Sequence, residues 1–390
     1  MRIAIITSGI LPVPAVLGGA VENLIDYALE YNEAHHLHDI TIYSIYHEKV
    51  NKHKVLKSKF NHYVYVNRNK MLTKIGAKLY SYFGKHYCYH YQLEYYFESV
   101  WCKMERTQYD LIILENRPGF ALQLSERCNT PIISHIHTNH LHEPTEKNQV
   151  IVKSTTRFLV VSHYIKNEIL KVGIKKDIRI VYNGLDSSLF NKQQSGAINR
   201  SQLGFKDNDF IAVFWGRLVP KKGIKELLLA MQQLKQHQDI KLLVIGAINY
   251  EDTSGQTNPF IDELKSIAKE LQDKIVFTGF IPYGKIANYL SIGNVAVIPS
   301  RINEAFGMTC IEACATGLPV IATNDGGIPE TLVGQKHILL NKEGDLTTQI
   351  ANAILDIRAN YQAYQGNYLN PIFTKEAYAK SFFNSITEIL

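Results

Sequence analysis

Two glutamates are the residues of this sequence best placed to do chemistry. Glu304 and Glu312 lie in PSRINEAFGMTCIEACATGLPVIATNDGG (299–327), with seven residues between them. A buried-strand pattern (294–300) precedes them and a second one (319–323) follows, so Glu304 falls in a loop and Glu312 about two turns into a helix. Two carboxylates that converge at the mouth of such a strand-loop-helix unit could form an acid/base couple or bind one ligand.

Two cations lie in GRLVPKKG, directly after another predicted strand. Gly216 and Gly223 permit close backbone approach beside Arg217 and Lys222. A planar guanidinium and a point-charge ammonium suit a diphosphate, although loops often carry lysines and Lys221 fits that simpler explanation. No Gly-Lys-Ser/Thr closes the loop and the chain has no G-x-G-x-x-G, which disfavours kinases, NTPases and ordinary dinucleotide enzymes.

A binding role suits the two glutamates better than an acid/base couple. Glu312 lies in IEACATG, a helix of small buried residues where an unpaired carboxylate would be costly, and it could accept hydrogen bonds from a ribose diol. Glu304 and the amides around Phe306 and Gly307 could hold sugar hydroxyls and phosphate near a helix N-terminus. The couple would need a nucleophile or water path that nothing else supplies, whereas Arg217 and Lys222 supply a diphosphate partner.

The elements that must position these residues form two alternating strand-helix series. The first series predicts strands at RIAIITS (2–8), DITIYS (39–44), DLIILE (110–115), PIISHIH (131–137), RFLVVS (157–162) and IRIVYNG (178–184). After a polar stretch, the second predicts strands at FIAVFWG (210–216), KLLVIGA (241–247), KIVFTGF (274–280), NVAVIPS (294–300), PVIAT (319–323) and HILLN (337–341). This alternation predicts an α/β fold with doubly wound parallel sheets.

The predicted domain boundary lies in the polar stretch 185–208, which has no sustained apolar period. We expect a first Rossmann-like domain at 1–186 and a second at 187–372. The last helix, within 373–390, should pack back on the first domain. The length of 390 residues and the 46% hydrophobic, 20% charged composition suit two globular domains.

A basic and aromatic region occupies residues 49–97. From Lys49 to Leu93 there are ten lysines and arginines and no acidic residue, within a net charge of +6. Aromatic residues crowd its end: Tyr80, Tyr82, Phe83, Tyr87, Tyr89, Tyr91, Tyr95 and Tyr96. The pattern suits an anionic membrane face, or a solvated insertion whose tyrosines pack on its own helices. Nucleic acid is disfavoured because no recognised binding motif accompanies the charge.

The remaining composition predicts a cytoplasmic protein without a membrane span. No apolar run approaches the roughly 20 residues a span needs, and MRIAIITSGI reads as a core strand and not as a signal peptide. Five cysteines, an odd number, show no paired metal-ligand spacing, which favours reduced thiols.

Several motifs together resemble one family. GGAVE, HIHT, VSHYIK, YNGLD, GRLVPKKG and NEAFGMTCIEACATGLPVIATNDGGIPE are similar to the retaining nucleotide-sugar glycosyltransferases of family four, which have the two-domain GT-B fold. The resemblance covers nearly the whole chain and is weakest over 45–108 and 190–208. The Glu-seven-Glu stretch with its flanks is highly specific, whereas GGAVE alone is weak.

The resemblance implies roles for residues of the second domain. It assigns Arg217 and Lys222 to the donor diphosphate, with the backbone around Phe306 and Gly307. It assigns Glu312 to the ribose. It also implies that Glu304 contacts the transferred sugar and counts among the catalytic residues.

In the first domain the resemblance implies a loop and a catalytic histidine. Gly18 and Gly19 would face the donor phosphates across the cleft. His137 matches the family histidine beside the transferred sugar and is preferred to His135, two residues earlier on the same strand. A hinge or sugar-side contact is expected at Asn183 and Gly184.

The implied reaction is sugar transfer with retention, without cofactor or metal. The donor would be a nucleoside-diphosphate sugar, UDP- or dTDP-linked, carrying for example a hexose or rhamnose. The acceptor would be a polyprenyl-diphosphate-linked saccharide in surface or capsular polysaccharide assembly. The enzyme would contact the inner face of the cell membrane through residues 49–97. A nucleotide-sugar epimerase and a non-catalytic sugar-nucleotide-binding protein remain the alternatives.

Overall fold

The computed structural model describes residues 1–390 apart from 54–56, 69, 85–86, 191–197, 248–258 and 388–390. Parts of the predicted basic region and of the polar boundary therefore lie outside the described residues, as does the side chain of Phe83. The chain divides into an N-terminal unit, Met1–Gly184 with Lys375–Leu390, and a C-terminal unit, Leu185–Thr374. The sequence predicts these divisions after residues 186 and 372.

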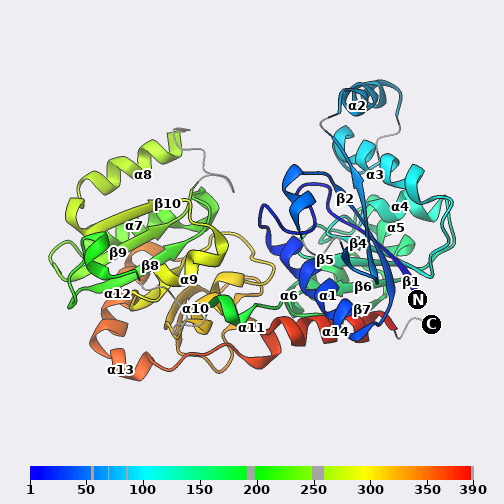
Figure 1. The fold of residues 1–390 in the computed structure, drawn as a ribbon. Helices are drawn as coiled ribbons and strands as arrows, with labels where there is room; N and C mark the ends of the chain where they lie inside the picture. The colour runs from blue at the N-terminus through cyan, green and yellow to red at the C-terminus, as the bar shows by residue number, and fades with distance from the viewer. Residues whose placement is uncertain (54–56, 69, 85–86, 191–197, 248–258, 388–390) are drawn as a thin grey trace. The chain divides into compact units, whose positions relative to one another are not determined.

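The N-terminal unit is built on a seven-stranded, fully parallel sheet with the order β3-β2-β1-β4-β5-β6-β7 (Figure 1). Its strands are β1 (Arg2–Ile6), β2 (Asp39–Ile45), β3 (Asn61–Val66), β4 (Leu111–Glu115), β5 (Ile132–Ile136), β6 (Arg157–Val160) and β7 (Asp177–Ile180). Its helices are α1 (Ala20–His35), α2 (Met71–Phe83), α3 (Tyr91–Met104), α4 (Phe120–Ser125), α5 (Glu146–Ser154), α6 (His163–Leu170) and α14 (Lys375–Thr387).

Alternating residues of the interior strand β1 face two different cores, as a doubly wound sheet requires. Ile3 and Ile5 of β1 pack in one core with residues of α1 and α14. Ala4 and Ile6 pack in the other core with residues of α3 and α4. Helices therefore cover both faces of the sheet, which is why its central strands read as continuous apolar runs.

One strand of this sheet was missed in the sequence. β3 lies inside the basic and aromatic region, where NHYVYV (61–66) mixes tyrosines with polar residues. It is the edge strand beside β2, so only part of its surface is buried and its apolar signal is weak. The region is thus partly sheet and partly the helices α2 and α3.

The C-terminal unit is a six-stranded parallel sheet with the order β10-β9-β8-β11-β12-β13. Its strands are β8 (Phe210–Trp215), β9 (Ile240–Ile245), β10 (Ile275–Gly279), β11 (Val295–Ile298), β12 (Val320–Thr323) and β13 (His337–Leu340). Its helices are α7 (Ile224–Gln233), α8 (Pro259–Lys269), α9 (Ile286–Leu290), α10 (Met308–Ala315), α11 (Ile328–Thr331), α12 (Leu346–Ala359) and α13 (Tyr361–Tyr364). The predicted class, two parallel-sheet α/β domains, is confirmed.

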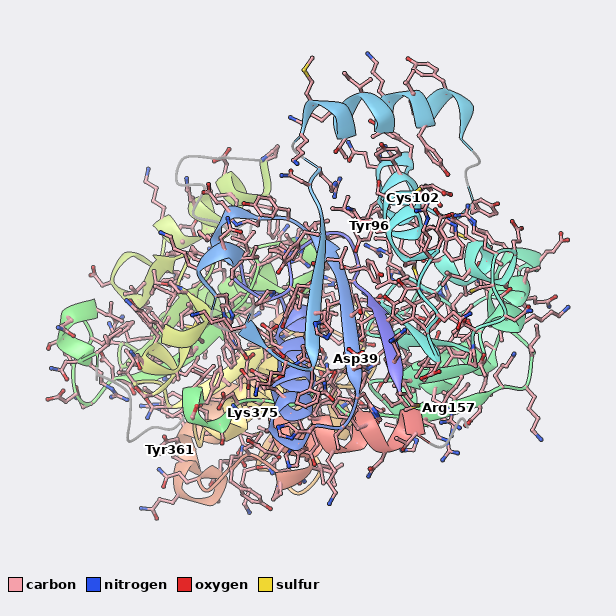
Figure 2. All side chains as sticks on the ribbon, turned by 45° about the vertical axis from the view of Figure 1, so that its right-hand side comes forward. Asp39, Tyr96, Cys102, Arg157, Tyr361 and Lys375 are labelled. Carbon is pink, nitrogen blue, oxygen red and sulfur yellow. The ribbon has the colours of Figure 1, made fainter. Side chains whose placement is uncertain are left out.

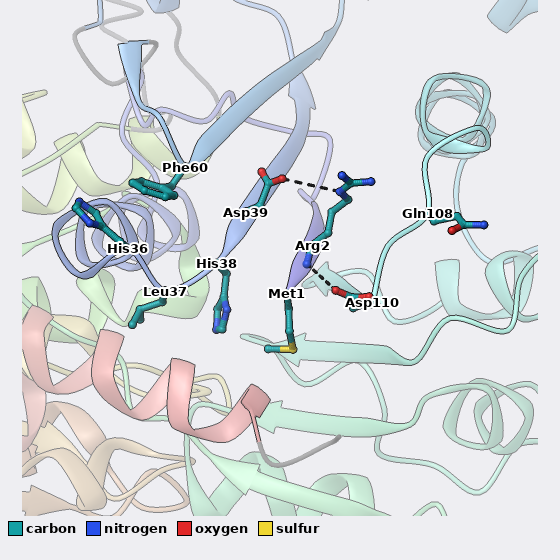
Figure 3. A pocket seen from close by; sticks show the side chains of 9 residues that line it. All are labelled: Met1, Arg2, His36, Leu37, His38, Asp39, Phe60, Gln108 and Asp110. Atoms are coloured by element: carbon teal, nitrogen blue, oxygen red, sulfur yellow. Dashed lines mark hydrogen bonds and ion pairs between the residues drawn. The ribbon is translucent and has the colours of Figure 1, made fainter.

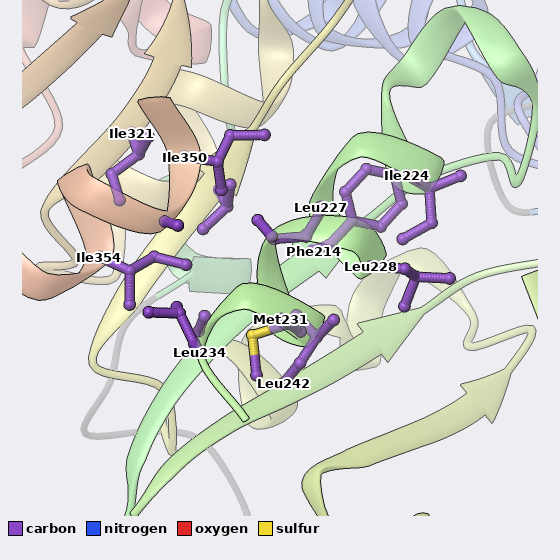
Figure 4. Close-up of a cluster of buried hydrophobic side chains, with 14 of the residues drawn as sticks. Phe214, Ile224, Leu227, Leu228, Met231, Leu234, Leu242, Ile321, Ile350 and Ile354 are labelled. Carbon is purple, nitrogen blue, oxygen red and sulfur yellow. The ribbon is translucent and has the colours of Figure 1, made fainter. Parts of the chain in front are cut away.

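The core of the C-terminal unit fixes the loops that follow its strands. Figure 4 shows Leu227 and Met231 of α7 packed with Ile350 and Ile354 of α12 beside Leu242 of β9. All five side chains are fully buried. The carboxyl ends of β8 and β11, where the candidate site lies, are therefore anchored on a rigid layer. Among the described residues, no helix is both long and apolar enough to cross a bilayer.

Candidate functional site

In the C-terminal unit the site is centred on the carboxylate of Glu312, on the buried side of α10. Trp215, the last residue of β8, donates its indole N–H to Oε2 at 2.7 Å. The Tyr283 hydroxyl donates to Oε1 at 3.1 Å from the short helical turn η7 (Tyr283–Lys285). Burial raises the pKa of Glu312, while the Trp215 and Tyr283 hydrogen bonds oppose that rise. The carboxylate is thus buried with both oxygens hydrogen-bonded.

Lys222 and Glu304 meet beside it. Lys222 ends the turn η5 (Pro220–Lys222), and its ammonium donates to Oε1 of Glu304, in the loop after β11. The Ser300 hydroxyl donates to the same oxygen at 2.8 Å. Both members of the ion pair are partly exposed, 24% for the lysine and 17% for the glutamate, so a ligand can reach them. The positive charge of Lys222 also favours the ionised form of Glu312.

Two glycines let the loops of this site approach one another. Gly223 has φ +71°, and a Cβ there would lie 1.9 Å from the carbonyl oxygen of Pro299. Gly326 has φ +55°, and a Cβ there would lie 2.1 Å from the carbonyl oxygen of Glu304. The next amide, of Gly327, donates to that same carbonyl at 2.8 Å. Side chains at these positions would push the Lys222 and Glu304 loops away from their places.

The other predicted residues of this unit lie at the same edge of the sheet. Arg217 lies two residues beyond the end of β8, after Gly216, and is half-buried. Phe306 is buried and meets Phe373 edge-on at 5.5 Å, so its ring belongs to the core and only its backbone is left for a ligand. Gly307, at φ +107°, is the N-cap of α10, a position whose free N–H groups suit an anion.

In the N-terminal unit the structure joins two histidines through one carboxylate. His137, just beyond β5, contacts Oε2 of Glu115 through Nε2 at 3.0 Å, and His135 approaches the same carboxylate through Nδ1 at 3.2 Å. All three side chains are buried, and the two rings lie 4.1 Å apart between centroids. β4 and β5 are neighbouring strands, which brings Glu115 at the end of one beside the histidines of the other.

The protonation of this group follows from its burial. Burial lowers the pKa of His137 to about 4 and His135 adds to that lowering, while Glu115 acts against it. Burial alone would raise the pKa of Glu115, but the two imidazoles hold it at about 2. The arrangement is therefore a neutral His137 that donates Nε2–H to an ionised Glu115. Nδ1 of His137 is buried without a hydrogen-bond partner among the described residues.

This histidine-carboxylate group also has the composition of a metal site. Glu115, His135 and His137 offer ligand atoms within 4.8 Å of one another. Their spacings of 3.0–3.3 Å are those of hydrogen bonds, and all three are buried. Glu115 thus joins the two histidines in a hydrogen-bonded triad, in which Nε2 of His135 and Nδ1 of His137 have no partner among the described residues.

The glycine loop of the N-terminal unit lies against a second buried acid. Gly18 has φ +77°, and Gly19, at φ +109°, is the N-cap of α1. A Cβ on Gly19 would lie 2.2 Å from Oε2 of Glu22. Burial raises the pKa of Glu22 to about 7, and the nearby Arg117 opposes that rise. The negative charge of Glu115, at the end of β4, also raises the pKa of Glu22. The buried carboxylates Glu115 and Glu22 therefore lie near one another, between β4 and the glycine loop.

Two further predicted residues lie at the boundary of the units. Asn183 is buried, and its Oδ1 has no hydrogen-bond partner among the residues described. Gly184 is the last residue of the contiguous part of the N-terminal unit. A hinge or sugar-side role for them stays a prediction.

Sequence reasoning missed four residues of the site: Trp215, Tyr283, Glu115 and Glu22. A usable signal existed for two of them. Trp215 ends a fully apolar strand, where a buried indole N–H needs an acceptor. Glu115 ends a strand buried at every residue, where a carboxylate needs a partner.

An open, polar pocket lies elsewhere and does not take part in this site. It is lined by Met1, Arg2, His36, Leu37, His38, Asp39, Phe60, Gln108 and Asp110 (Figure 3). β1 and β2 begin at Arg2 and Asp39, so the pocket lies at the amino ends of the strands. Ligands of open α/β sheets bind at the carboxyl ends, where the residues described above lie.

Comparison with known proteins identifies the class of enzyme. The model of Glycosyltransferase Family 4 matches residues 56–189, and that of the Glycosyl transferases group 1 matches residues 197–366. The chain is therefore a glycosyltransferase with the GT-B fold. It belongs to the group 1 glycosyltransferases, which confirms the family resemblance.

Individual proteins agree with this assignment. The chain is 29% identical over 345 residues to the putative glycosyltransferase YtcC of Bacillus subtilis, covering 85% of this chain and 77% of that protein. It is 28% identical over 227 residues, 57% of each protein, to the lipopolysaccharide 1,2-N-acetylglucosaminetransferase of Salmonella typhimurium. The crystal structure of Anabaena HepE with UDP-glucose superimposes with a TM-score of 0.71 and 19% identity, covering 100% of both chains.

Proposed function

We propose that this glycosyltransferase moves a sugar, with retention, from a UDP- or dTDP-linked donor to a lipid-linked saccharide of a surface or capsular polysaccharide. The observation that carries the proposal is the cluster of Lys222, Glu304 and Glu312 at the carboxyl edge of the C-terminal sheet. The cluster combines a cation for a diphosphate with two acceptors for hydroxyls, in the segment that matches the group 1 model.

Each group has a defined role in the proposed reaction. Arg217, Lys222 and the amides at the N-terminus of α10 bind the donor diphosphate, Glu312 binds the ribose, and Glu304 binds the transferred sugar. His137, neutral and fixed by Glu115, is assigned to the same sugar. The acceptor hydroxyl attacks the anomeric carbon on the face from which the diphosphate departs. The bond to the β-phosphate oxygen breaks, and that oxygen receives the hydroxyl proton.

The cations and the helix terminus take the place that a metal has in other transferases. They neutralise the charge that develops on the departing diphosphate, and a preorganised site of this kind costs no reorganisation during the reaction. We therefore propose that neither metal nor cofactor takes part. The Lys222–Glu304 ion pair breaks when the diphosphate binds, because Lys222 then pairs with the diphosphate in place of Glu304.

Two relatives support the finer parts of this proposal. HepE has been crystallised with UDP-glucose, which supports a UDP-linked donor. The Salmonella relative is a lipopolysaccharide N-acetylglucosaminetransferase, which supports a saccharide acceptor on a lipid. Hexose, deoxyhexose and N-acetylhexosamine donors belong in the first assay.

A helix of the N-terminal unit supports a lipid-linked acceptor. At about 100° per residue, the exposed Met71, Ile75, Leu79 and Tyr82 share one face of α2. An adjacent face packs on α3, where a Cβ on Gly76 would lie against the hydroxyl of Tyr95. Figure 2 shows α2, light blue at the top, with side chains that project away from the rest of this unit. Met71, Ile75 and Leu79 are thus large apolar side chains that are exposed on this helix.

The surroundings of this face are cationic. Lys70, Lys74 and Lys78 are exposed along the helix. Of the acids on the neighbouring α3, Glu98 is paired with Arg127 and Glu94 is buried. An apolar face flanked by lysines suits the boundary of an anionic bilayer. We propose that the enzyme docks there on the inner face of the cell membrane, through the basic and aromatic region 49–97.

The reaction is tested with donors and one variant. Transfer is measured for UDP-, dTDP- and GDP-sugars onto a lipid-linked saccharide, and product analysis with donor alone separates transfer from epimerisation. Glu304→Ala should reduce transfer by at least a hundredfold, while circular dichroism and thermal unfolding stay native. Glu343→Ala, an exposed glutamate of the same unit, is the control. Full activity of the Glu304 variant, or no turnover of any donor, contradicts the proposal.

A further inference from the structure

Glu312 is held by two donors whose effect reaches beyond stabilising a buried charge. The indole N–H of Trp215 donates to one carboxylate oxygen at 2.7 Å, and the hydroxyl of Tyr283 donates to the other at 3.1 Å. The two donors come from β8 and η7, which are separate elements of the C-terminal unit. One donor on each oxygen fixes the rotation of the carboxylate about its last bond.

Packing keeps both donors in place. Trp215 is 5% exposed at the end of a fully buried strand. Phe190, itself fully buried, meets the Tyr283 ring edge-on at 5.6 Å. The carboxylate cannot turn without losing one of its hydrogen bonds, because neither donor is free to follow it. Its remaining acceptor positions therefore point in fixed directions.

A fixed carboxylate distinguishes sugars by their number of hydroxyls. An ionised carboxylate has about four acceptor positions, two on each oxygen, and Trp215 and Tyr283 occupy one on each. One position per oxygen remains, which matches the two neighbouring hydroxyls of a ribose. A 2′-deoxyribose fills only one of them and leaves the other unpaired in a buried site.

We propose that Trp215 and Tyr283 are positioning residues that make the donor site select ribonucleotides over 2′-deoxyribonucleotides. The inference rests on the proposed role of Glu312 at the donor ribose. It also narrows that proposed function, because it favours UDP-linked over dTDP-linked sugars among its donors. The proposal concerns the sugar of the nucleotide and assigns no base.

The test is a comparison of nucleotide affinities on the full-length protein. Titration calorimetry is carried out with UDP, GDP and ADP and with the 2′-deoxy form of each. For the base that binds, the native protein should prefer the ribonucleotide by at least about tenfold, the loss expected when a buried acceptor is left unpaired. Trp215→Phe and Tyr283→Phe should each reduce that preference to about threefold or less, mainly by lowering the affinity for the ribonucleotide.

Two matched variants separate positioning from general damage. Trp101→Phe makes the same change in the N-terminal unit. Tyr364→Phe removes another tyrosine hydroxyl that donates to a carboxylate, Asp356 at 2.8 Å, in the C-terminal unit. Both controls should keep the native preference. Tyr283→Phe carries the test alone if Trp215→Phe does not fold, because Tyr283 is only partly buried.

The possible results separate the positioning role of Trp215 and Tyr283 from the proposed glycosyl transfer. Equal affinity of the native protein for both sugars overturns the inference and leaves glycosyl transfer standing. A native preference that survives in both phenylalanine variants overturns the positioning role. Failure of these six nucleotides and of dTDP to bind overturns the proposed function and the inference together.

Discussion

The backbone of the donor-side loops constrains the site as tightly as its charged side chains do. Lys222 reaches Glu304 because the chain turns at Gly223 directly against the carbonyl of Pro299. Gly279 offers a natural comparison, since it also has φ +71° but has nothing within 4 Å of the place where a Cβ would lie. The two glycines have the same φ angle and differ in what surrounds them.

Gly223→Ala should therefore damage the protein more than Gly279→Ala. Both pay the strain of an alanine in the left-handed region, about 1–2 kcal/mol. Only Gly223→Ala adds a backbone clash, which costs about 1–3 kcal/mol more and displaces Lys222. Urea denaturation of both variants measures the stability difference, and calorimetry with the donor nucleotide should show weaker binding for Gly223→Ala alone. Equal effects would show that the approach to Pro299 is not constraining.

The charged residues of the site could be predicted from the sequence, but their partners could not. Glu304, Glu312 and Lys222 lie in local motifs whose residue types and spacing carry the signal. Glu312 and Trp215 are 97 residues apart, and their hydrogen bond depends on β8 and β11 being neighbours in the sheet. Periodicity gives the strands but not their order, so pairing between strand ends is not readable from one sequence.

At the scale of elements, the same reasoning explains where the prediction of the fold succeeded and where it stopped. Strands buried on both faces, such as β4 and β5, are visible in the sequence as apolar runs and were predicted. The edge strand β3 was not, because only part of it is covered. The sequence of the aromatic region 49–97 also did not show how its two helices differ. Residues of α3 are buried in the core, whereas Met71, Ile75 and Leu79 of α2 are exposed.

The outward face of α2 gives the element-scale prediction. Ile75→Ser with Leu79→Ser should weaken binding to phosphatidylglycerol vesicles by at least about tenfold. The double change removes two apolar groups from the helix face that would enter the bilayer. Lys74→Glu with Lys78→Glu should do the same on anionic vesicles only, at about 1 kcal/mol per charge. Cosedimentation of the full-length protein with anionic and with neutral vesicles measures both effects.

The C-terminal unit offers matched controls for both pairs. Val333→Ser with Ile372→Ser removes two apolar side chains of similar exposure. Lys265→Glu with Lys269→Glu reverses two exposed lysines at the same spacing on α8. Neither control should change vesicle binding. Native protein that ignores anionic vesicles, or that forms a dimer through α2 instead, would refute the docking proposal.

At the scale of the whole molecule, the N-terminal unit is completed by residues from the far end of the chain. α14 packs along α1, and its Tyr378, Phe382, Phe383 and Ile386 are buried in the core that also contains β1. The connection leaves the N-terminal unit after Gly184 and returns at Lys375. In the C-terminal unit, the core cluster that contains β8 and β9 is formed by described residues between 210 and 357.

Removal of residues 375–390 should unfold the N-terminal unit and spare the other. Four large buried side chains at about 1.5–3 kcal/mol each amount to roughly 6–12 kcal/mol, which is comparable with the whole stability of a domain. Hydrogen exchange measured by mass spectrometry should show lost protection in β1, β4 and β5, with β8 and β9 still protected. Native protection of β1 in the truncated chain would contradict this account.

The return of α14 has a consequence for the order in which the protein is made. A ribosome releases the first sheet early, but that sheet lacks part of its core until a further 190 residues have been translated, from 185 to 374. At about 5–20 residues per second this delay is about 10–40 s. The unit encoded second can therefore close first. The nascent N-terminal sheet, with its apolar strands uncovered, is the part of the chain most in need of a chaperone.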